Sequence, residues 1–251
     1  MPDRRDARVH KNSAFIYTPV AILLAVFLSA FGVSVFFRVT AIEVSGASKY
    51  APEEIIAKSG LKIGDNLIFI DFAAARRKLT GEPYISEAKI TRALPDTIEI
   101  YITESVPAAA VSDAGVQWLI DADARILERR EAAPGAARPG CMVVSGISPV
   151  SPAPGSAMAV APESETRLRY LTDILGAVGE KGISGDVEEL DISNISGITL
   201  VYRGIAVVMG SGENAGYKLD RMLGAAEDAA RINESVTKID VSRDGHTSIS
   251  K

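Results

Sequence analysis

The chain has 251 residues, of which 47% are hydrophobic and 24% are charged, which is the composition of a folded protein rather than of a disordered one. Its 32 acidic and 27 basic side chains give a net charge of −5, so the chain lacks the basic excess of nucleic-acid-binding proteins. The single cysteine, Cys141, excludes an intramolecular disulfide, so any folded domain must be held together by packing alone.

The first feature along the chain is a charge-free stretch between Lys11 and Arg38. Within it, residues 20–37 are almost wholly apolar and predict a transmembrane helix, because a helix of ~20 apolar residues crosses the ~30 Å hydrocarbon core of a bilayer. Four basic residues precede the stretch and only Arg38 closely follows it, so residues 1–19 should form a cytoplasmic tail. The alternative is a signal peptide cleaved near Ala41, but the apolar run is longer than a signal core.

Residues 38–106 predict a small unit with the element order β-α-α-β-β. The elements are a strand at 39–44, helices that begin near Pro52 and Asp71, and strands at 85–93 and 97–105. In the last strand Ile98, Ile100 and Ile102 alternate with polar residues, which places the three isoleucines on one buried face.

Four short phrases mark this unit. They are Phe37-Arg38-Val39 with Ile42-Glu43-Val44-Ser45-Gly46, Leu61-Lys62-Ile63-Gly64-Asp65-Asn66-Leu67, Arg92-Ala93-Leu94-Pro95-Asp96-Thr97-Ile98-Glu99-Ile100, and Glu104-Ser105-Val106-Pro107-Ala108-Ala109. In this order, directly after an apolar segment, they resemble the POTRA domain of the FtsQ/DivIB bacterial cell-division proteins. The resemblance implies structural roles for Gly46, Gly64, Pro95, Glu104 and Pro107. Ser105 replaces the arginine that is usual after this glutamate, so any contact made by that arginine is absent here.

Residues 107–251 predict a second, mixed α/β domain that ends in a hairpin. Residues 131–162 are rich in Pro, Ala, Gly and Ser and predict a long exposed loop, interrupted by a short strand at 141–144. The helix at 163–178 has one apolar side, which could fit a partner's groove but which we expect to lie on its own sheet. The other predicted elements are strands at 116–120, 125–128, 187–192, 198–202, 205–209, 236–242 and 246–250, and a helix at 217–232.

The sequence shows no catalytic constellation. His10 and His246 lie on opposite sides of the predicted membrane segment, so they cannot share a metal site or act together on Cys141. The Gly210–Gly216 stretch sits between a strand and a helix, but its glycine spacing differs from the dinucleotide-binding motif, so we interpret it as a plain connecting loop. We therefore expect no enzyme activity, no metal, no cofactor, no small-molecule substrate and no nucleic-acid partner.

The resemblance implies an α+β fold with a transmembrane helix, a POTRA domain and a β domain. It implies a bitopic divisome scaffold at the septum of the cytoplasmic membrane, with the folded domains outside, that binds FtsB/DivIC-like and FtsL-like partners and helps regulate septal peptidoglycan synthesis. The lipid bilayer would be contacted through residues 20–37. Lys218-Leu219 resembles a K-L motif of the family.

The resemblance also implies a partner-binding edge. In FtsQ-like proteins the final strand receives a strand from FtsB, and the corresponding residues here are Thr247, Ser248, Ile249 and Ser250. The alternative for these residues is a frayed end of the chain. Two other classes of protein stay open: a membrane-anchored cell-wall enzyme, which would need catalytic residues, and a POTRA-bearing transport component, which would carry tandem POTRA repeats and a β-barrel.

Overall fold

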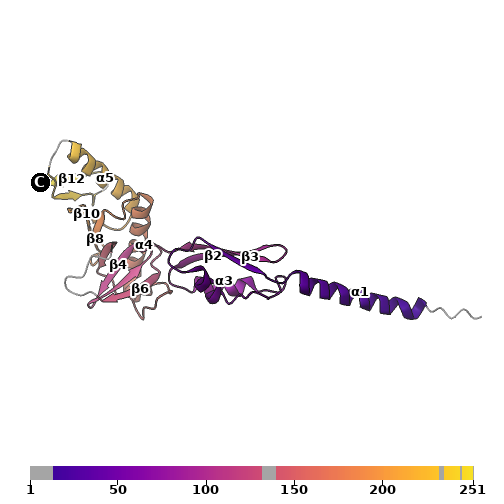
Figure 1. Ribbon diagram of the computed structural model, residues 1–251. Coiled ribbons are helices and arrows are strands. Elements are labelled where there is room, and N and C mark those ends of the chain that lie inside the picture. The colour runs from indigo at the N-terminus through magenta and orange to yellow at the C-terminus, as the bar shows by residue number, and fades with distance from the viewer. Residues whose placement is uncertain (1–13, 132–139, 232–234, 244, 251) are drawn as a thin grey trace, which may run out of the picture.

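The computed structural model describes residues 14–131, 140–231, 235–243 and 245–250. Three parts lie in a row: a long N-terminal helix, a first folded unit, and a second, larger unit at the far end from the helix (Figure 1). The predicted tail falls on residues 1–19, of which 1–13 lie outside the described residues, and so do residues 132–139 of the predicted loop.

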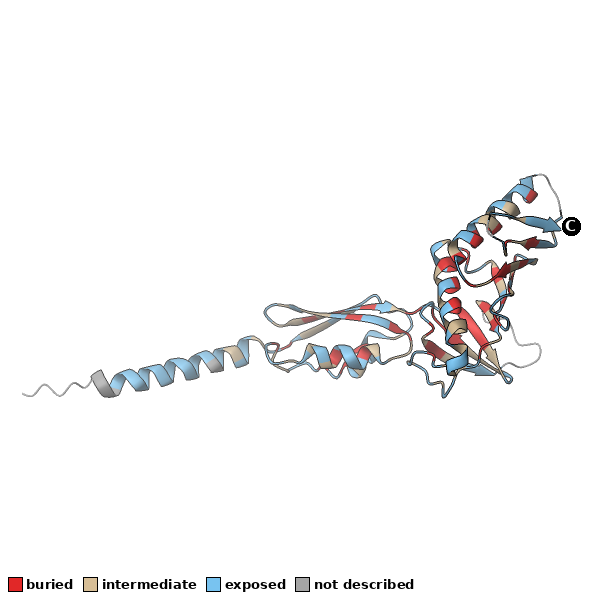
Figure 2. Ribbon diagram, turned by 180° about the vertical axis from the view of Figure 1, so that it is seen from behind, coloured by how far each residue is buried: buried red, intermediate tan, exposed pale blue. Residues whose placement is uncertain are grey.

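Helix α1 (Ala14–Phe36) is apolar on all sides and stands clear of both folded units (Figure 2). Its candidate membrane span, Tyr17–Phe36, has 20 residues with a mean hydropathy of 2.4, and none of its most apolar window is buried by the rest of the chain. The helix begins at Ala14, earlier than the predicted residue 20, because the charge-free residues before Val20 continue the same helix. A single apolar helix of this length is consistent with a single-pass membrane protein.

The first unit has the predicted order of elements. They are β1 (Ala41–Ser45), α2 (Pro52–Ser59), α3 (Phe72–Thr80), β2 (Ile85–Ala93) and β3 (Thr97–Glu104). The sheet order is β1-β3-β2, with β1 parallel and β2 antiparallel to the central β3. Ile98, Ile100 and Ile102 of β3 are all buried, which confirms the face predicted from their alternation.

Local sequence signals account for both helices of this unit. The Asp71 side chain accepts a hydrogen bond from the Ala74 amide and so caps α3 at its N-terminus. Gly60 ends α2 in the left-handed conformation, with a φ of +77° that few other residues adopt. The predicted starts of both helices are confirmed.

The second unit is one nine-stranded sheet with the order β12-β11-β10-β9-β8-β7-β4-β5-β6. Helices α4 and α5 pack on one face of it, where their apolar residues and those of the strands form the largest core of the described chain (Figure 2). The elements are β4 (Ala109–Asp113), β5 (Val116–Ile120), β6 (Ile126–Glu131), β7 (Met142–Ser145), a 3₁₀ turn (Pro162–Ser164), α4 (Glu165–Glu180), β8 (Val187–Asp191), β9 (Ile198–Tyr202), β10 (Ile205–Gly210), α5 (Ala215–Arg231), β11 (Lys238–Asp240) and β12 (Ser248–Ser250).

The structure corrects the expectations for this unit at three places. Strand β4 was not predicted, although it lies between β7 and β5 near the middle of the sheet. The predicted exposed loop is anchored, because Ile147 and Met158 are buried at 3% exposure each. The last two strands are shorter than predicted, since pairing between β11 and β12 covers only three residues on each.

Helix α4 settles the choice between a partner's groove and the protein's own sheet. Leu171, Ile174 and Val178 of this helix are almost completely buried against the sheet. Its apolar side therefore packs against the protein's own sheet, as we expected.

Candidate functional site

Strand β12 forms one edge of the nine-stranded sheet, at the end of the molecule opposite α1 (Figure 1). It pairs antiparallel with β11 through Lys238, Ile239 and Asp240, and no described strand lies on its other side. An edge of this kind exposes backbone N–H and C=O groups to a partner. The direction in which these groups point decides which residues a partner could bind.

The bonds between β11 and β10 fix the backbone directions along β11. The Val241 amide donates to the Val208 carbonyl at 2.9 Å, and the Ala206 amide donates to the Thr237 carbonyl at 3.0 Å. Because backbone groups of successive strand residues point to alternate sides, Ile239 and Val241 face β10, as does the Thr237 carbonyl. The Thr237 amide instead donates to the Ser250 carbonyl of β12 at 3.1 Å. Lys238 and Asp240 must then face β12.

The register of β12 follows from that alternation. Lys238 lies opposite Ser250 and Asp240 opposite Ser248, so these are the hydrogen-bonded pairs of the ladder. Ile249 lies between them, and its backbone N–H and C=O point away from β11 toward the open edge. Its side chain is 44% exposed. Ile249 is therefore the residue of β12 whose backbone is placed to pair with an added strand.

The turn that leads into β12 is held by Arg221 of α5. Its guanidinium donates to the Thr247 hydroxyl at 2.9 and 3.2 Å and to the Arg243 carbonyl at 2.7 Å. Asp240 accepts bonds from the hydroxyl and the amide of Ser242, and these bonds lower the pKa of Asp240 and keep it charged. Thr247 thus serves the protein's own structure, and no sequence pattern indicated the role of Arg221.

The glycines of the first unit's motif differ in how strictly they are needed. Gly46 has a φ of +81°, and a Cβ atom there would collide with the Ile102 carbonyl, so both space and backbone geometry require glycine. Gly64 has a φ of +95° but faces open space. Pro95 lies in the β2–β3 turn after a cis peptide bond, and Pro107 leads from the first unit into β4.

Glu104 of the motif fixes the segment that follows β1. Its carboxylate accepts hydrogen bonds from the amides of Ser48 and Lys49, each at 2.7 Å. Burial alone would raise the pKa of Glu104, but these hydrogen bonds outweigh it and lower the pKa. Glu104 thus holds the segment that begins at Gly46, while Gly64 and Pro95 lie in other turns, so these motif residues have structural contacts and do not converge on one site.

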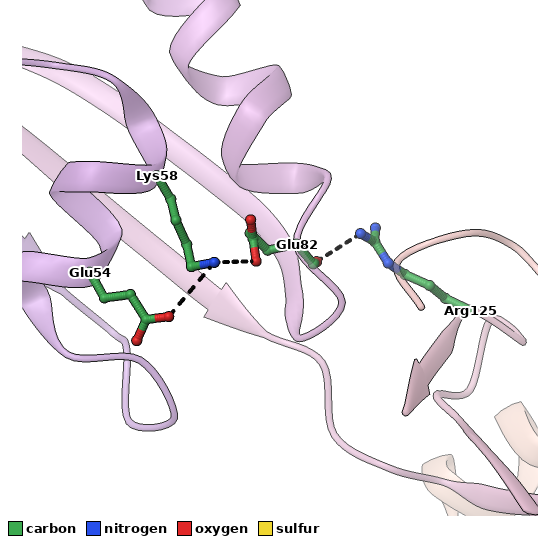
Figure 3. A network of polar contacts seen from close by, with 4 residues as sticks. All are labelled: Glu54, Lys58, Glu82 and Arg125. Atoms are coloured by element: carbon green, nitrogen blue, oxygen red, sulfur yellow. Dashed lines mark hydrogen bonds and ion pairs between the residues drawn. The ribbon is translucent and has the colours of Figure 1, made fainter. Parts of the chain in front are cut away.

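Contacts between the two units centre on Arg125 (Figure 3). Its guanidinium donates to the carbonyls of Thr80 and Glu82, at the C-terminal end of α3, with 2.8 Å to Glu82. A cation at this end of a helix interacts favourably with the helix dipole. The side-chain carboxylate of Glu82 accepts a hydrogen bond from the Lys58 ammonium at 2.8 Å. The same ammonium lies 3.7 Å from the Glu54 carboxylate.

A second set of contacts crosses the same junction. The Tyr84 hydroxyl donates to Glu128 at 2.6 Å, and the Lys49 ammonium lies 3.7 Å from the centre of the Tyr84 ring. Burial and the bond to Glu128 raise the pKa of Tyr84, so the phenol stays a donor. Ser105, the residue that departs from the family pattern, donates to Asp121 at 3.0 Å within this buried junction.

The features that could have suggested chemistry have structural explanations. Cys141 lines a cavity of about 330 Å³, and burial raises the pKa of its thiol, which disfavours the nucleophilic thiolate. The loop from Gly210 into α5 is tied by Lys218, whose ammonium donates to the Ser211 carbonyl at 2.8 Å, while Gly212 lies against the Tyr170 ring. Among the described residues, no three His, Cys, Asp or Glu side chains gather as a metal site.

Comparisons with known proteins agree with one family. The family described as "POTRA domain, FtsQ-type" matches residues 37–105. Cell division protein DivIB of Clostridium tetani is 24% identical over 74% of this chain and 68% of its own length. Cell division protein FtsQ of Chloroflexus aurantiacus is 32% identical over 59% of this chain and 52% of its own, and FtsQ of Corynebacterium glutamicum is 31% identical over 46% and 52%. The aligned region thus spans about half to two thirds of these relatives.

Among solved structures, the major extracytoplasmic domain of DivIB from Geobacillus stearothermophilus matches 51% of this chain and 97% of its own, with 16% identity and a TM-score of 0.32. That score is too low to bear on the fold. The POTRA match directly after α1 and the shared names of the relatives agree with each other. Residues 37–105 therefore form an FtsQ-type POTRA domain, and the chain is similar to the bacterial cell-division proteins FtsQ and DivIB.

Proposed function

We propose that this chain is a non-enzymatic, single-pass scaffold of the division machinery that binds an FtsB/DivIC-like partner by strand addition at β12 and assembles with an FtsL-like protein. Through this complex it regulates septal peptidoglycan synthesis at the septum. The observation that carries the proposal is the open edge of β12, where the backbone of Ile249 faces away from the sheet. The cell-division names of the relatives support the process in which it acts.

The opposite edge of the same sheet is a poorer acceptor. Strand β6 carries the consecutive charged residues Glu128, Arg129, Arg130 and Glu131, which discourage the addition of a strand. Its beginning is also covered, because the Ile126 amide donates to the Ser156 carbonyl at 2.8 Å. Strand β12 reads Ser-Ile-Ser and has no charge, so the contrast between the edges favours β12.

A substitution at Ile249 tests the edge directly. Ile249→Pro removes the outward-pointing amide, so recovery of the FtsB/DivIC-like partner on co-purification from membranes should fall strongly. Ile249→Val keeps the amide and should leave recovery unchanged. Ser248→Pro is a poorer probe, because the Ser248 amide faces β11 and its loss would disturb the sheet itself. Circular dichroism should show the same fold in the Ile249 variants.

The result at Ile249 can contradict the proposal clearly. Undiminished recovery of the partner with Ile249→Pro, in a protein whose circular dichroism matches the parent, would move the binding site away from β12. Loss of recovery with Ile249→Val as well would point to the side chain rather than the backbone.

The orientation in the membrane is tested separately. We propose that the N-terminal tail is cytoplasmic and that both folded units lie outside, because four basic residues precede the apolar stretch and only Arg38 closely follows it. A reporter enzyme that is active only outside the cell should be active when fused after Ser105 and silent when fused after Lys11. A soluble, shortened product would show instead that the segment is a cleaved signal.

A further inference from the structure

Large apolar side chains are exposed at the end of the first unit that faces α1. Ile63 and Phe69, in the loop between α2 and α3, are 71% and 79% exposed, and Ile68 in the same loop is 42% exposed. Leu94, in the β2–β3 turn, is 67% exposed. Isolated apolar residues on a surface are ordinary, so the position of these four decides whether they have a role.

The α2–α3 loop is hydrogen-bonded to the last turns of α1. The Asn66 side-chain amide donates to the Val33 carbonyl at 3.1 Å, and the Leu67 amide donates to the Phe37 carbonyl at 2.8 Å. Arg38, just after α1, forms a backbone bridge with Asn66. These bonds hold the loop that carries Phe69 directly against the end of the apolar helix.

The β2–β3 turn belongs to the same end of the unit. The Thr40 amide donates to the Asp96 carbonyl at 2.8 Å, beside the end of α1, and the Arg92 guanidinium donates to the Leu67 carbonyl at 2.9 Å. Both ribbon views place this turn at the end of the first unit that points toward α1 (Figures 1 and 2). Leu94 therefore lies at the same end as the α2–α3 loop.

The length of α1 sets the depth of this end relative to a bilayer. The span Tyr17–Phe36 has 20 residues, which at ~1.5 Å per residue reach roughly 30 Å, the thickness of the hydrocarbon core. Val33 lies within one helical turn of the end of that span, so the hydrocarbon boundary falls close to the carbonyl that Asn66 contacts. The four apolar side chains then face the boundary between acyl chains and headgroups.

We propose that Ile63, Ile68, Phe69 and Leu94 form a membrane-facing rim that inserts into the leaflet where α1 ends and holds the first unit against the bilayer. The occupant is the lipid interface because the loops that carry the rim are bonded to the segment that crosses it. The nearby charges balance, with Arg38, Lys62 and Arg92 against Asp65, Asp71 and Asp96, so insertion rests on apolar contact and not on attraction to anionic lipid. This inference depends on α1 spanning the membrane and not on the division role.

The test places a fluorescent probe on the rim of the full-length chain. Cys141→Ser removes the native thiol, and Phe69→Cys or Ile63→Cys then carries nitrobenzoxadiazole. Val106→Cys is the matched control, because Val106 is 73% exposed at the opposite end of the first unit. Each protein is reconstituted in phosphatidylcholine vesicles that contain lipids with a nitroxide near the headgroup, and flotation with the vesicles shows that α1 is inserted.

We expect the probes at positions 63 and 69 to have blue-shifted emission and to be quenched by the lipid nitroxides several-fold more than the probe at 106. Iodide in the water should quench them less than the control. Equal quenching at all three positions, in protein that floats with the vesicles, would overturn the rim. Quenching that appears only when phosphatidylglycerol is added would overturn apolar insertion as its cause.

Discussion

Removal of the Arg125 side chain should weaken the coupling between the two folded units. In the structure Arg125 lies in the second unit, yet its guanidinium donates to the carbonyls of Thr80 and Glu82 at the end of α3 in the first. Figure 3 shows the contact with Glu82. Thr80 is the last residue of α3, so its carbonyl lacks a partner further along the helix. Arg125→Ala removes both donors and the positive charge at this helix end.

The contacts of Arg125 set the size of the effect. Two hydrogen bonds from a charged donor contribute about 1.5–3 kcal/mol each. Against this gain, the Arg125 Nε is buried without a partner, which costs about 1–3 kcal/mol and is relieved by the substitution. The Glu82 carbonyl also keeps a bond from the Ile85 amide. The net loss should therefore be about 2 kcal/mol, or roughly 30-fold in the unfolding equilibrium.

Urea unfolding of the full chain in detergent measures this loss. Trp118, the only tryptophan, lies in β5 and reports on the second unit, while circular dichroism reports on both. In the parent the two signals should change together, and in Arg125→Ala the circular dichroism transition should begin at lower urea. Arg129→Ala, at an exposed residue of β6, the strand that follows Arg125, is the control. If Arg125→Ala matched that control, water would be replacing the guanidinium without cost and the junction would rest on other contacts.

Four further substitutions test the first unit. Gly46→Ala should destabilise it by about 3 kcal/mol or more in thermal unfolding, whereas Gly64→Ala, which adds strain but no clash, should cost about 1 kcal/mol. Burial raises the pKa of Glu104, but hydrogen bonds outweigh burial and lower this pKa below its ordinary value of 4.5. The stability that the ionised Glu104 contributes is therefore complete above pH 4.5 and is lost as the pH falls below it. Glu104→Gln should lower the melting temperature at neutral pH and match the parent in acid. Ile100→Asp should unfold the unit, because an unpaired buried carboxylate costs several kcal/mol against a stability of about 5, and a native circular dichroism spectrum would show that the face is misassigned.

The structural features that the sequence predicted correctly are those set by patterns within a few neighbouring residues. The alternation of Ile98, Ile100 and Ile102 and the cap at Asp71 act within a few residues, so both were readable. Strand β4 was missed because Ala109, Ala110 and Val111 are all completely buried. A strand buried on both faces has no period-two alternation, and small residues give little strand signal of their own.

The hydrogen bonds between residues far apart in the sequence could not be predicted, for a different reason. Arg125 and Arg221 both donate to backbone carbonyls, and every residue offers a carbonyl. Only the fold determines which carbonyls come within reach, so a sequence shows an arginine but not its partner. Position 105 shows the same limit, because the loss of an expected arginine was visible but the bond from Ser105 to Asp121 was not.

The arrangement of the units constrains the kind of partner that can use β12. Hydrogen bonds join the α2–α3 loop to α1, and Arg125 joins the first unit to the second, so each joint is held by contacts rather than by a free linker. Strand β12 lies beyond both joints, at the end of the molecule farthest from α1 (Figure 1). A membrane-anchored partner must therefore present its strand well away from the bilayer, as an extended or helical stalk allows. A partner whose binding strand directly follows its own membrane helix would not reach this edge.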